Sequence, residues 1–235
     1  MRNLLIIFTV LVWSSAGAQK TFIGVKAGGH TGSAYIDHTI FNNFNNAGFK
    51  GGFNAGLMVK YFPKKREVFL KSGIQFSVNY AKKGWTQIFL EEPTYSAEMS
   101  YVEVPIEAIG FFGNKNNYFI TAGFFFEYLI DHQLGNAPNF DVDVEGNTIL
   151  NQVDGQDWYT FQATRDNKVG YGARASGGVF REFSFGMLHL EGFFSYSISN
   201  FMNAGDLTSE TPDISNLWYT GVSLGYLFKV GKDNN

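Results

Sequence analysis

The sequence contains no cysteine, only five prolines in 235 residues, and few charged side chains. Without cysteine, neither a disulfide framework nor a thiolate metal site can form. Charged residues make up 17% of the chain, whereas roughly 25% is usual for soluble domains. The chain therefore has few charged side chains from which to build a water-facing surface. With a net charge of −3 and no basic patch, nucleic acid is not an expected partner, and no cofactor is expected either.

The N-terminus has the three parts of an export signal. Arg2 supplies a positive charge, residues 4–13 form an apolar run, and Ala16-Gly17-Ala18 fits the small-residue cleavage pattern. This run is too short to span a membrane as a helix, which needs about twenty residues. We therefore expect residues 1–18 to be a signal peptide and residues 19–235 to form the exported domain.

Glycine and aromatic residues are abundant, and apolar and polar residues alternate along most of the chain. In one stretch, Ile74 and Phe76 lie on one face, while Gln75 and Ser77 lie on the other. Such period-two alternation predicts a strand with two different faces. The same pattern predicts eight strands, at 22–30, 51–62, 68–80, 101–112, 118–130, 168–180, 187–199 and 217–228.

The predicted connections between these strands alternate between short and long. Short connections are expected near 63–66, 113–117 and 181–184. Long connections are expected at about 31–50, 82–100, 131–167 and 200–216. This alternation is typical of an up-and-down barrel in a bacterial outer membrane, where short turns face the periplasm and long loops face outside. Because eight is an even number, both termini are expected on the periplasmic side.

A soluble barrel would show the same alternation with its faces reversed, so other features must decide between lipid and water. The polar faces are rich in Gly, Ser and Asn, which suit the narrow interior of an eight-stranded barrel. Aromatic residues gather at the strand ends of the apolar face, as in the girdles of membrane barrels. We therefore predict an all-β, eight-stranded, antiparallel up-and-down transmembrane barrel in the outer membrane of a Gram-negative bacterium. Its expected partners are outer-membrane lipid and the barrel assembly machinery.

Charged residues of both signs fall on the polar faces in equal number. Buried charges must pair, so this balance predicts a network inside the barrel. Eight strands leave an interior that side chains just fill, which favours a structural network over a proton or small-solute path. The predicted network consists of Lys26, Lys60, Lys71, Glu103, Glu107, Glu127, Arg174 and Glu191.

Within the long connection at 131–167, residues 141–152 begin with the Asp and Gly spacing of a calcium-binding loop. Glu145 and Gln152 do not fit the ligand pattern of such a loop. We therefore expect an acidic external loop rather than a metal site. Acidic and aromatic side chains on a long loop could bind a protein, a glycan or a lipid head group. The candidate contacts are Asp141, Asp143, Glu145, Trp158 and Tyr159.

Two further features bear on activity and on the barrel wall. His30 and His132 lie at outer strand ends, where a lipid A-modifying barrel enzyme would need a histidine, but no catalytic serine can be assigned. We therefore expect a non-enzymatic protein. Pro105 lies within a predicted strand and cannot donate to the ladder, so we expect a bulge there rather than a lateral opening, although a locally unpaired site would also fit.

Three motifs occur in a specific order: G-x-K-x-G from Gly24, Q-x-S followed by K-G from Gln75, and Y-x-E-x-P from Tyr101. In this order they resemble the Bacteroidetes outer-membrane β-barrel family, often called the PorT family. The resemblance implies the barrel fold and the outer-membrane location. The expected function is a non-enzymatic structural or interaction role through the long loops. The alternatives are an accessory of a type IX-like secretion system, which the namesake member suggests, a lipid A-modifying enzyme, or a small-solute pore.

Overall fold

The computed structural model describes residues 18–37, 46–63, 71–89, 92–134, 166–203 and 213–230. Its strands are β1 (Ala18–Asp37), β2 (Asn46–Gly48), β3 (Lys50–Pro63), β4 (Lys71–Phe89), β5 (Glu92–Gly113), β6 (Asn116–Leu134), β7 (Val169–Phe183), β8 (Gly186–Ser197) and β9 (Ile214–Val230). β2 and β3 both pair with β4 and are separated by one residue, Phe49, so they act as one interrupted strand. Within the described ranges, no helix is long and apolar enough to cross a membrane.

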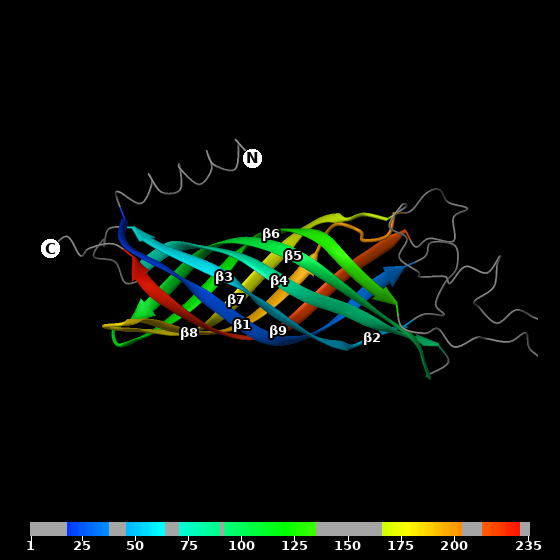
Figure 1. Cartoon of the computed structure of the whole chain (residues 1–235), viewed down its shortest axis with the longest axis horizontal. Coiled ribbons are helices and arrows are strands. Elements are labelled where there is room, and N and C mark those ends of the chain that lie inside the picture. The colour runs from blue at the N-terminus through cyan, green and yellow to red at the C-terminus, as the bar shows by residue number, and fades with distance from the viewer. Residues whose placement is uncertain are drawn as a thin grey trace, which may run out of the picture.

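The strands close into one barrel in which chain neighbours are also neighbours in space (Figure 1). All pairings are antiparallel, and the order β4-β3-β1-β9-β8-β7-β6-β5 is closed by pairing of β4 with β5. The first and last strands pair along their length, from Thr21 opposite Val230 to Asp37 opposite Ile214. The predicted eight-stranded, antiparallel up-and-down barrel is confirmed.

The two ends of the barrel differ in the connections they carry. One end, here called the turn end, holds the tight turns 114–115 and 184–185. The start of β1 and the end of β9 lie at the same end (left in Figure 1). Gly113 enters the first turn with φ +122°, a backbone conformation that favours glycine. The second turn lies later than the predicted 181–184, because β7 continues to Phe183. The opposite end is called the loop end.

The strands extend further toward the loop end than the sequence pattern predicts. Most of the predicted loop 82–100 is strand, since β4 runs to Phe89 and β5 begins at Glu92. The alternation continues there, but the polarity of the faces reverses: Trp85 points inward and is buried, and Lys82 points outward. An outward polar face beyond the apolar band is expected where the barrel leaves lipid and enters water. The prediction of a loop was wrong because it required the outward face to stay apolar.

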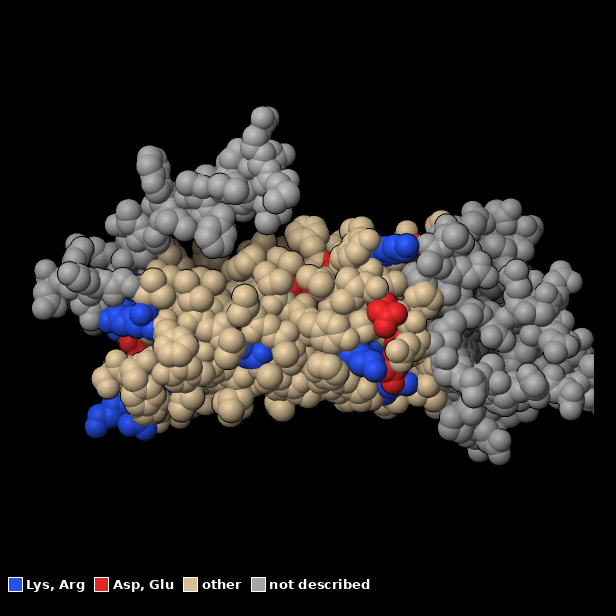
Figure 2. All heavy atoms as spheres, in the orientation of Figure 1, with Lys and Arg blue, Asp and Glu red and all other residues tan. Residues whose placement is uncertain are grey.

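The outer wall of the barrel is apolar and exposed. On β6, the outward side chains from Tyr118 to Ile130 include Phe124, which is 67% exposed, and Ile120, which is 68% exposed. At about 3.3 Å per residue this face is roughly 40 Å long, and at a strand tilt of about 40° it spans about 30 Å. That height matches the hydrocarbon core of a bilayer. Between the two ends, the face shown in Figure 2 is covered mainly by uncharged residues.

Pro105 interrupts the β4–β5 ladder without shifting its register. Pairing runs to Phe76 opposite Ile106 and resumes at Asn79 opposite Glu103 with the same offset. A bulge would change that offset, so the predicted bulge is wrong, and the site is locally unpaired instead. The pairs of Ser77 and Val78 with β5 are missing, because they would need a hydrogen bond from the backbone N–H of residue 105 to Ser77. Proline has no backbone N–H and cannot donate it.

Candidate functional site

The first motif shapes the seam between β1 and β9. A Cβ atom at Gly24 would lie 1.9 Å from the carbonyl oxygen of Tyr226, and one at Gly28 would lie 2.1 Å from that of Val222. β1 therefore approaches β9 more closely at these two positions than any other residue allows. Between them, Lys26 points into the barrel interior, the lumen, where its side chain is fully buried. The G-x-K-x-G pattern thus combines close strand approach with one inward charge.

Glu191 on β8 lies at the centre of the lumen. Its carboxylate is 3.2 Å from Lys26 Nζ and 3.0 Å from Arg174 Nη2. Ser223 donates a hydrogen bond to the same carboxylate oxygen, Oε1, at 3.1 Å, and Gln75 Nε2 donates to the other at 3.4 Å. The carboxylate is therefore fully buried but paired and hydrogen-bonded, as a stable buried charge requires.

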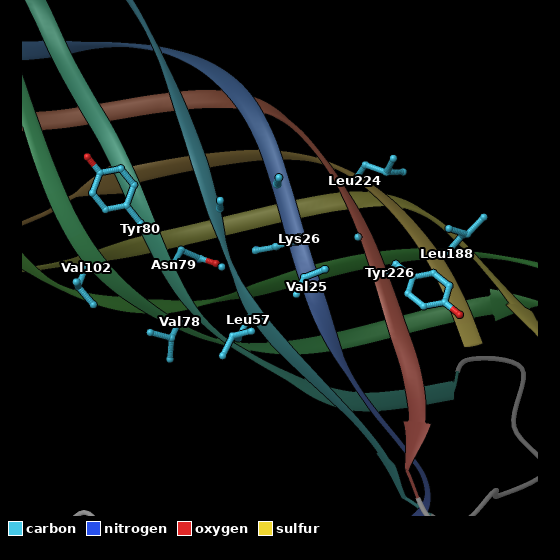
Figure 3. Close-up of a pocket in the computed structure, with 14 residues that line it drawn as sticks. Val25, Lys26, Leu57, Val78, Asn79, Tyr80, Val102, Leu188, Leu224 and Tyr226 are labelled. Carbon is cyan, nitrogen blue, oxygen red and sulfur yellow. The ribbon is translucent and has the colours of Figure 1, made fainter. Parts of the chain in front are cut away.

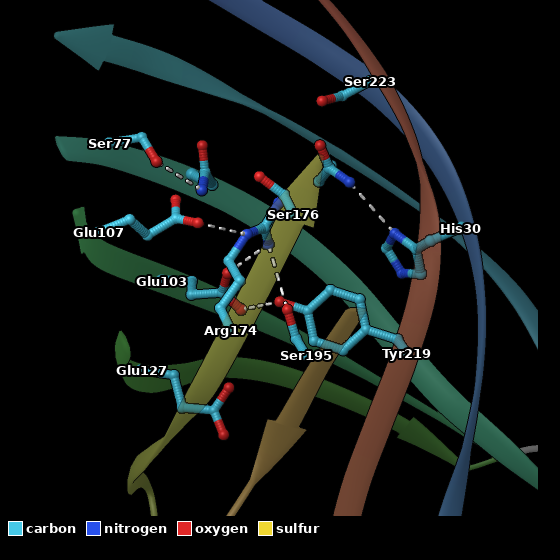
Figure 4. A network of polar contacts seen from close by, with 12 residues as sticks. His30, Ser77, Glu103, Glu107, Glu127, Arg174, Ser176, Ser195, Tyr219 and Ser223 are labelled. Carbon is cyan, nitrogen blue, oxygen red and sulfur yellow. Dashed lines mark hydrogen bonds and ion pairs between the residues drawn. The ribbon is translucent and has the colours of Figure 1, made fainter. Parts of the chain in front are cut away.

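Arg174 on β7 links Glu191 to two carboxylates of β5. Figure 4 shows its contacts with these two carboxylates, Glu103 and Glu107. Its Nη1 lies 3.4 Å from Glu103, and its Nε lies 3.9 Å from Glu107. Glu107 also accepts a hydrogen bond from the Thr121 hydroxyl at 2.6 Å. One guanidinium thus joins three carboxylates, which its planar set of donors makes possible.

Lys83 on β4 forms a second centre nearer the loop end. Its Nζ lies 2.8 Å from Glu103 and 2.5 Å from Glu127. The ammonium also lies 4.3 Å from the centroid of the Tyr219 ring, a cation–π distance. The Tyr219 hydroxyl in turn donates a hydrogen bond to Glu103.

Lys60 is the exception among the buried cations. Its Nζ has no hydrogen-bond partner among the described residues and lies 4.5 Å from the Phe119 ring and 5.3 Å from the Phe180 ring. Nearby, the His189 ring packs against the Phe119 ring at a tilt of 38° and places Nε2 3.6 Å from Glu191. Lys60 is thus held by aromatic faces rather than by a carboxylate.

The structure buries seven of the eight charges that the sequence assigned to the lumen. Lys71 lies elsewhere: at the turn end, its Nζ donates to the Gly113 carbonyl at 3.3 Å. The fourth buried cation is Lys83, which the sequence interpretation missed. Continuing the inward phase of Gln75 and Ser77 would have found it, but the predicted strand ended too early. The buried set still contains four cations and four carboxylates.

Two apolar clusters enclose this charged layer. At the turn end, Phe62 packs 4.8 Å from the Phe111 ring and 5.9 Å from the Phe180 ring. The turn-end cluster consists of Phe22, Met58, Phe62, Ile109, Phe111, Phe119, Phe180, Met187 and Leu227. The loop-end cluster consists of Ala34, Trp85, Ala97, Met99, Tyr101, Leu129, Phe201, Met202 and Leu217.

The residues after β8 turn inward to complete the loop-end cluster. Phe201 N donates to Ser215 O at 2.9 Å, and its own carbonyl accepts from Asn167 N at 3.1 Å. These bonds hold the Phe201 ring 4.8 Å from that of Trp85 and bury Met202 completely. The lumen is therefore covered by apolar side chains at both ends.

The remaining predicted site residues are not part of this arrangement. Asp141, Asp143, Glu145, Trp158 and Tyr159 lie outside the described residues. His30 is buried in the lumen, where Nε2 contacts Lys82 O at 2.9 Å and Nδ1 contacts Asn54 at 3.3 Å. Within the described part of the chain, no group of three or more His, Asp or Glu residues could hold a metal ion.

A groove of about 700 Å³ lies on the outer wall rather than in the lumen (Figure 3). Val25, Leu57 and Leu224 line it with outward apolar side chains, and the small Ala27 and Ala55 lie opposite each other within it. The lining is mainly apolar and lies in the lipid-facing band, and the hydroxyls of Tyr80 and Tyr226 are already hydrogen-bonded to Ser100 and to the Phe185 carbonyl.

At the loop end, an ion-pair cluster lies outside the apolar band. Glu98 is 3.1 Å from Lys50 Nζ and also pairs with Lys82. The hydrogen bond from Lys82, supported by Lys50, lowers the pKa of Glu98, and the same bond raises the pKa of Lys82. Both groups therefore stay charged at neutral pH.

Solved structures of low sequence identity are similar to this chain. They include the crystal structure of the outer membrane protein OprG from Pseudomonas aeruginosa (10% identity, 92% of this chain and 98% of that chain, TM-score 0.49). Neisserial surface protein A, NspA, gives 13% identity, coverage of 87% and 96%, and a TM-score of 0.43. Ail, the attachment invasion locus protein of Yersinia pestis, gives 11% identity, coverage of 89% and 99%, and a TM-score of 0.41.

No curated protein matches the chain. The family described as outer membrane protein beta-barrel domain matches residues 17–203, which include all of β1 to β8. This is most of the chain, and it agrees with a closed barrel whose outer wall is apolar. The chain belongs to the outer membrane protein beta-barrel domain family.

Proposed function

We propose that this outer-membrane protein is a non-conducting, non-enzymatic barrel that serves as a rigid support for interaction-bearing loops. The observation that carries the proposal is the enclosed lumen: four cations and four carboxylates lie between two apolar clusters. A path for ions would need continuous water, and the paired charges and packed rings occupy the space that water would need.

Planar-bilayer recording of the purified full chain tests the absence of conduction. We expect no discrete current steps in symmetric salt solutions. Replacing Phe201 and Met202 together by alanine should leave the membrane silent, because the turn-end cluster still closes the lumen. Reproducible conductance steps from the unmodified protein would contradict the proposal and favour the small-solute pore.

The surroundings of the buried histidines support a role without catalysis. His30 contacts a carbonyl oxygen and an amide, and His189 lies between Phe119 and Glu191. Within the described part of the chain, neither imidazole is hydrogen-bonded to a hydroxyl group, as a nucleophile–base pair would require. We expect lipid A mass spectra to be unchanged in a deletion strain. A missing or new acyl chain, restored by the intact gene, would instead establish lipid A modification.

The loops supply the interaction part of the proposal. The loop end faces outside, both termini are periplasmic, and the 131–167 segment contacts a partner through Asp141, Asp143, Glu145, Trp158 and Tyr159. The short connections at the turn end support this orientation. Surface cross-linking from residue 143, replaced by cysteine in this cysteine-free chain, should capture the partner. A matched cysteine at position 115 in the turn end is the control and should stay unlabelled in intact cells.

Membership of the Bacteroidetes PorT-like group and a secretion accessory role form a second proposal. The support is the G-x-K-x-G motif, whose glycines adjoin β9 while Lys26 reaches Glu191. Assaying exported proteins in the medium of a deletion strain tests this role. Unchanged secretion would eliminate the accessory role and leave the structural one. The export signal at residues 1–18 and the need for barrel assembly machinery belong to the same set of proposals.

A further inference from the structure

The turn end of the barrel carries an excess of positive charge. Five described basic residues lie there against a single acidic one, Glu182, and Figure 2 shows blue side chains gathered at that end. They come from β1, β4, the β5–β6 turn, β7 and β9, so they are distributed around the rim. We call this set the basic collar: Lys20, Lys71, Lys115, Arg181 and Lys229.

The loop end has the opposite balance. Three described basic residues, Lys50, Lys82 and Lys168, lie there outside the lumen. The acidic residues whose side chains are described at that end are Asp37, Glu98, Asp131, Asp166 and Asp213. The collar is therefore a property of one end and not of the molecule as a whole.

The one acidic residue described at the turn end, Glu182, is already paired. Lys20 Nζ lies 2.6 Å from the Glu182 carboxylate, and this pair joins β1 to β7 across the rim. Among the described residues, no carboxylate forms an ion pair with Lys71, Lys115 or Arg181. Register places these last two close together, since Asn116, next to Lys115, pairs with Arg181. Their positive charge is thus available to a partner outside the chain.

Aromatic rings place the collar at a defined depth. Phe112 stacks on Tyr118 with centroids 5.8 Å apart, and Phe183 stacks on Phe185 at 5.1 Å. Such rings mark the boundary between hydrocarbon and head groups. The Arg181 guanidinium lies 5.2 Å from the Phe183 ring, beside this aromatic boundary. Exposed lysine and arginine side chains at this height extend toward the head groups.

We propose that the basic collar binds the phosphate groups of anionic phospholipids in the leaflet around the turn end, with Lys115 and Arg181 as the main contacts. A guanidinium offers paired donors that match a phosphate, and an ammonium adds a point charge. The inference rests on the membrane-spanning barrel alone. It does not depend on which side of the membrane the loops face or on what they bind.

Native mass spectrometry of the full chain tests the proposal after reconstitution in nanodiscs of equal phosphatidylglycerol and phosphatidylcholine. The unmodified protein should retain phosphatidylglycerol preferentially. Replacing Lys115 and Arg181 by glutamine should lower the affinity for phosphatidylglycerol by about 25-fold, or roughly fivefold for each charge. K50Q/K82Q, which removes the same charge from the loop end, is the matched control and should retain the preference. K115R should retain it as well.

Two results would overturn the proposal. Equal retention of the two lipids by the unmodified protein would mean that the collar does not select anionic head groups. An equal loss in K50Q/K82Q would mean that net charge and not the collar is responsible. If the protein instead sedimented with purified peptidoglycan and showed no lipid preference, the partner would be the cell wall. Circular dichroism of each variant verifies that the barrel is folded.

Discussion

Glu191 shows how strongly the lumen depends on single residues. It pairs with Lys26 and Arg174, and all three side chains are almost completely buried. Replacing it by glutamine leaves the buried cations Lys26 and Arg174 without the negative charge that Glu191 supplies. We expect E191Q to lose about 3–5 kcal/mol of unfolding free energy, measured by urea titration in lipid vesicles.

The matched control is E182Q at the rim. The Glu182 side chain is 31% exposed and that of its partner Lys20 is 37% exposed, so solvent screens the pair. We expect a loss of no more than about 1 kcal/mol. Similar losses in both variants would mean that burial does not set the strength of these pairs.

Glu98 provides a pH-dependent prediction outside the membrane band. Its pKa is lowered from the ordinary value of 4.5 by the hydrogen bond from Lys82 and by Lys50. A lowered folded-state pKa contributes stability above the unfolded-state pKa, and this contribution is lost as the pH falls through the folded-state pKa. We therefore expect E98Q to be slightly less stable than the unmodified protein at pH 7. The two unfolding midpoints should converge as the pH falls well below 4.5. A constant difference from pH 7 to pH 3 would contradict this assignment.

At the scale of elements, the seam where the first strand, β1, pairs with the last strand, β9, offers two adjacent glycines as a matched pair. A Cβ at Gly28 would lie 2.1 Å from a backbone oxygen, whereas one at Gly29 would meet nothing within 4 Å. We expect G28A to destabilise the barrel by about 1–3 kcal/mol, as overpacking does. G29A should change stability by less than about 0.5 kcal/mol. The measurement is again unfolding in vesicles, and equal effects would refute close approach as the reason for the glycine.

The element boundaries show where sequence patterns are reliable and where they are not. All eight strands were predicted within the apolar band, because lipid on one side and a filled lumen on the other maintain the alternation. Toward the loop end the outward face becomes polar at Lys82 and the inward face apolar at Trp85. The alternation persists with reversed polarity, and a search for an apolar outward face ends too early.

At the scale of the whole molecule, the exposed apolar wall decides the behaviour in water. Side chains such as Ile120 and Phe124 are about two-thirds exposed over the height of a bilayer. We expect the chain beginning at Gln19 to aggregate in detergent-free buffer and to fold to a monomer after transfer into detergent. Size-exclusion chromatography with circular dichroism checks both states. A monodisperse protein without detergent would mean that the apolar face does not contact lipid.

The sequence by itself determined the strand number, the inward and outward faces and most of the buried charges, because each depends on residues that are neighbours in one strand. Tertiary structure alone decided which charges meet: Lys26 and Glu191 are 165 positions apart and come together only when the barrel closes. It also decided that Lys71 lies at the turn end and not in the lumen, and that apolar clusters cover both ends. These features depend on strand register and on the depth of each residue in the barrel, which local alternation does not specify.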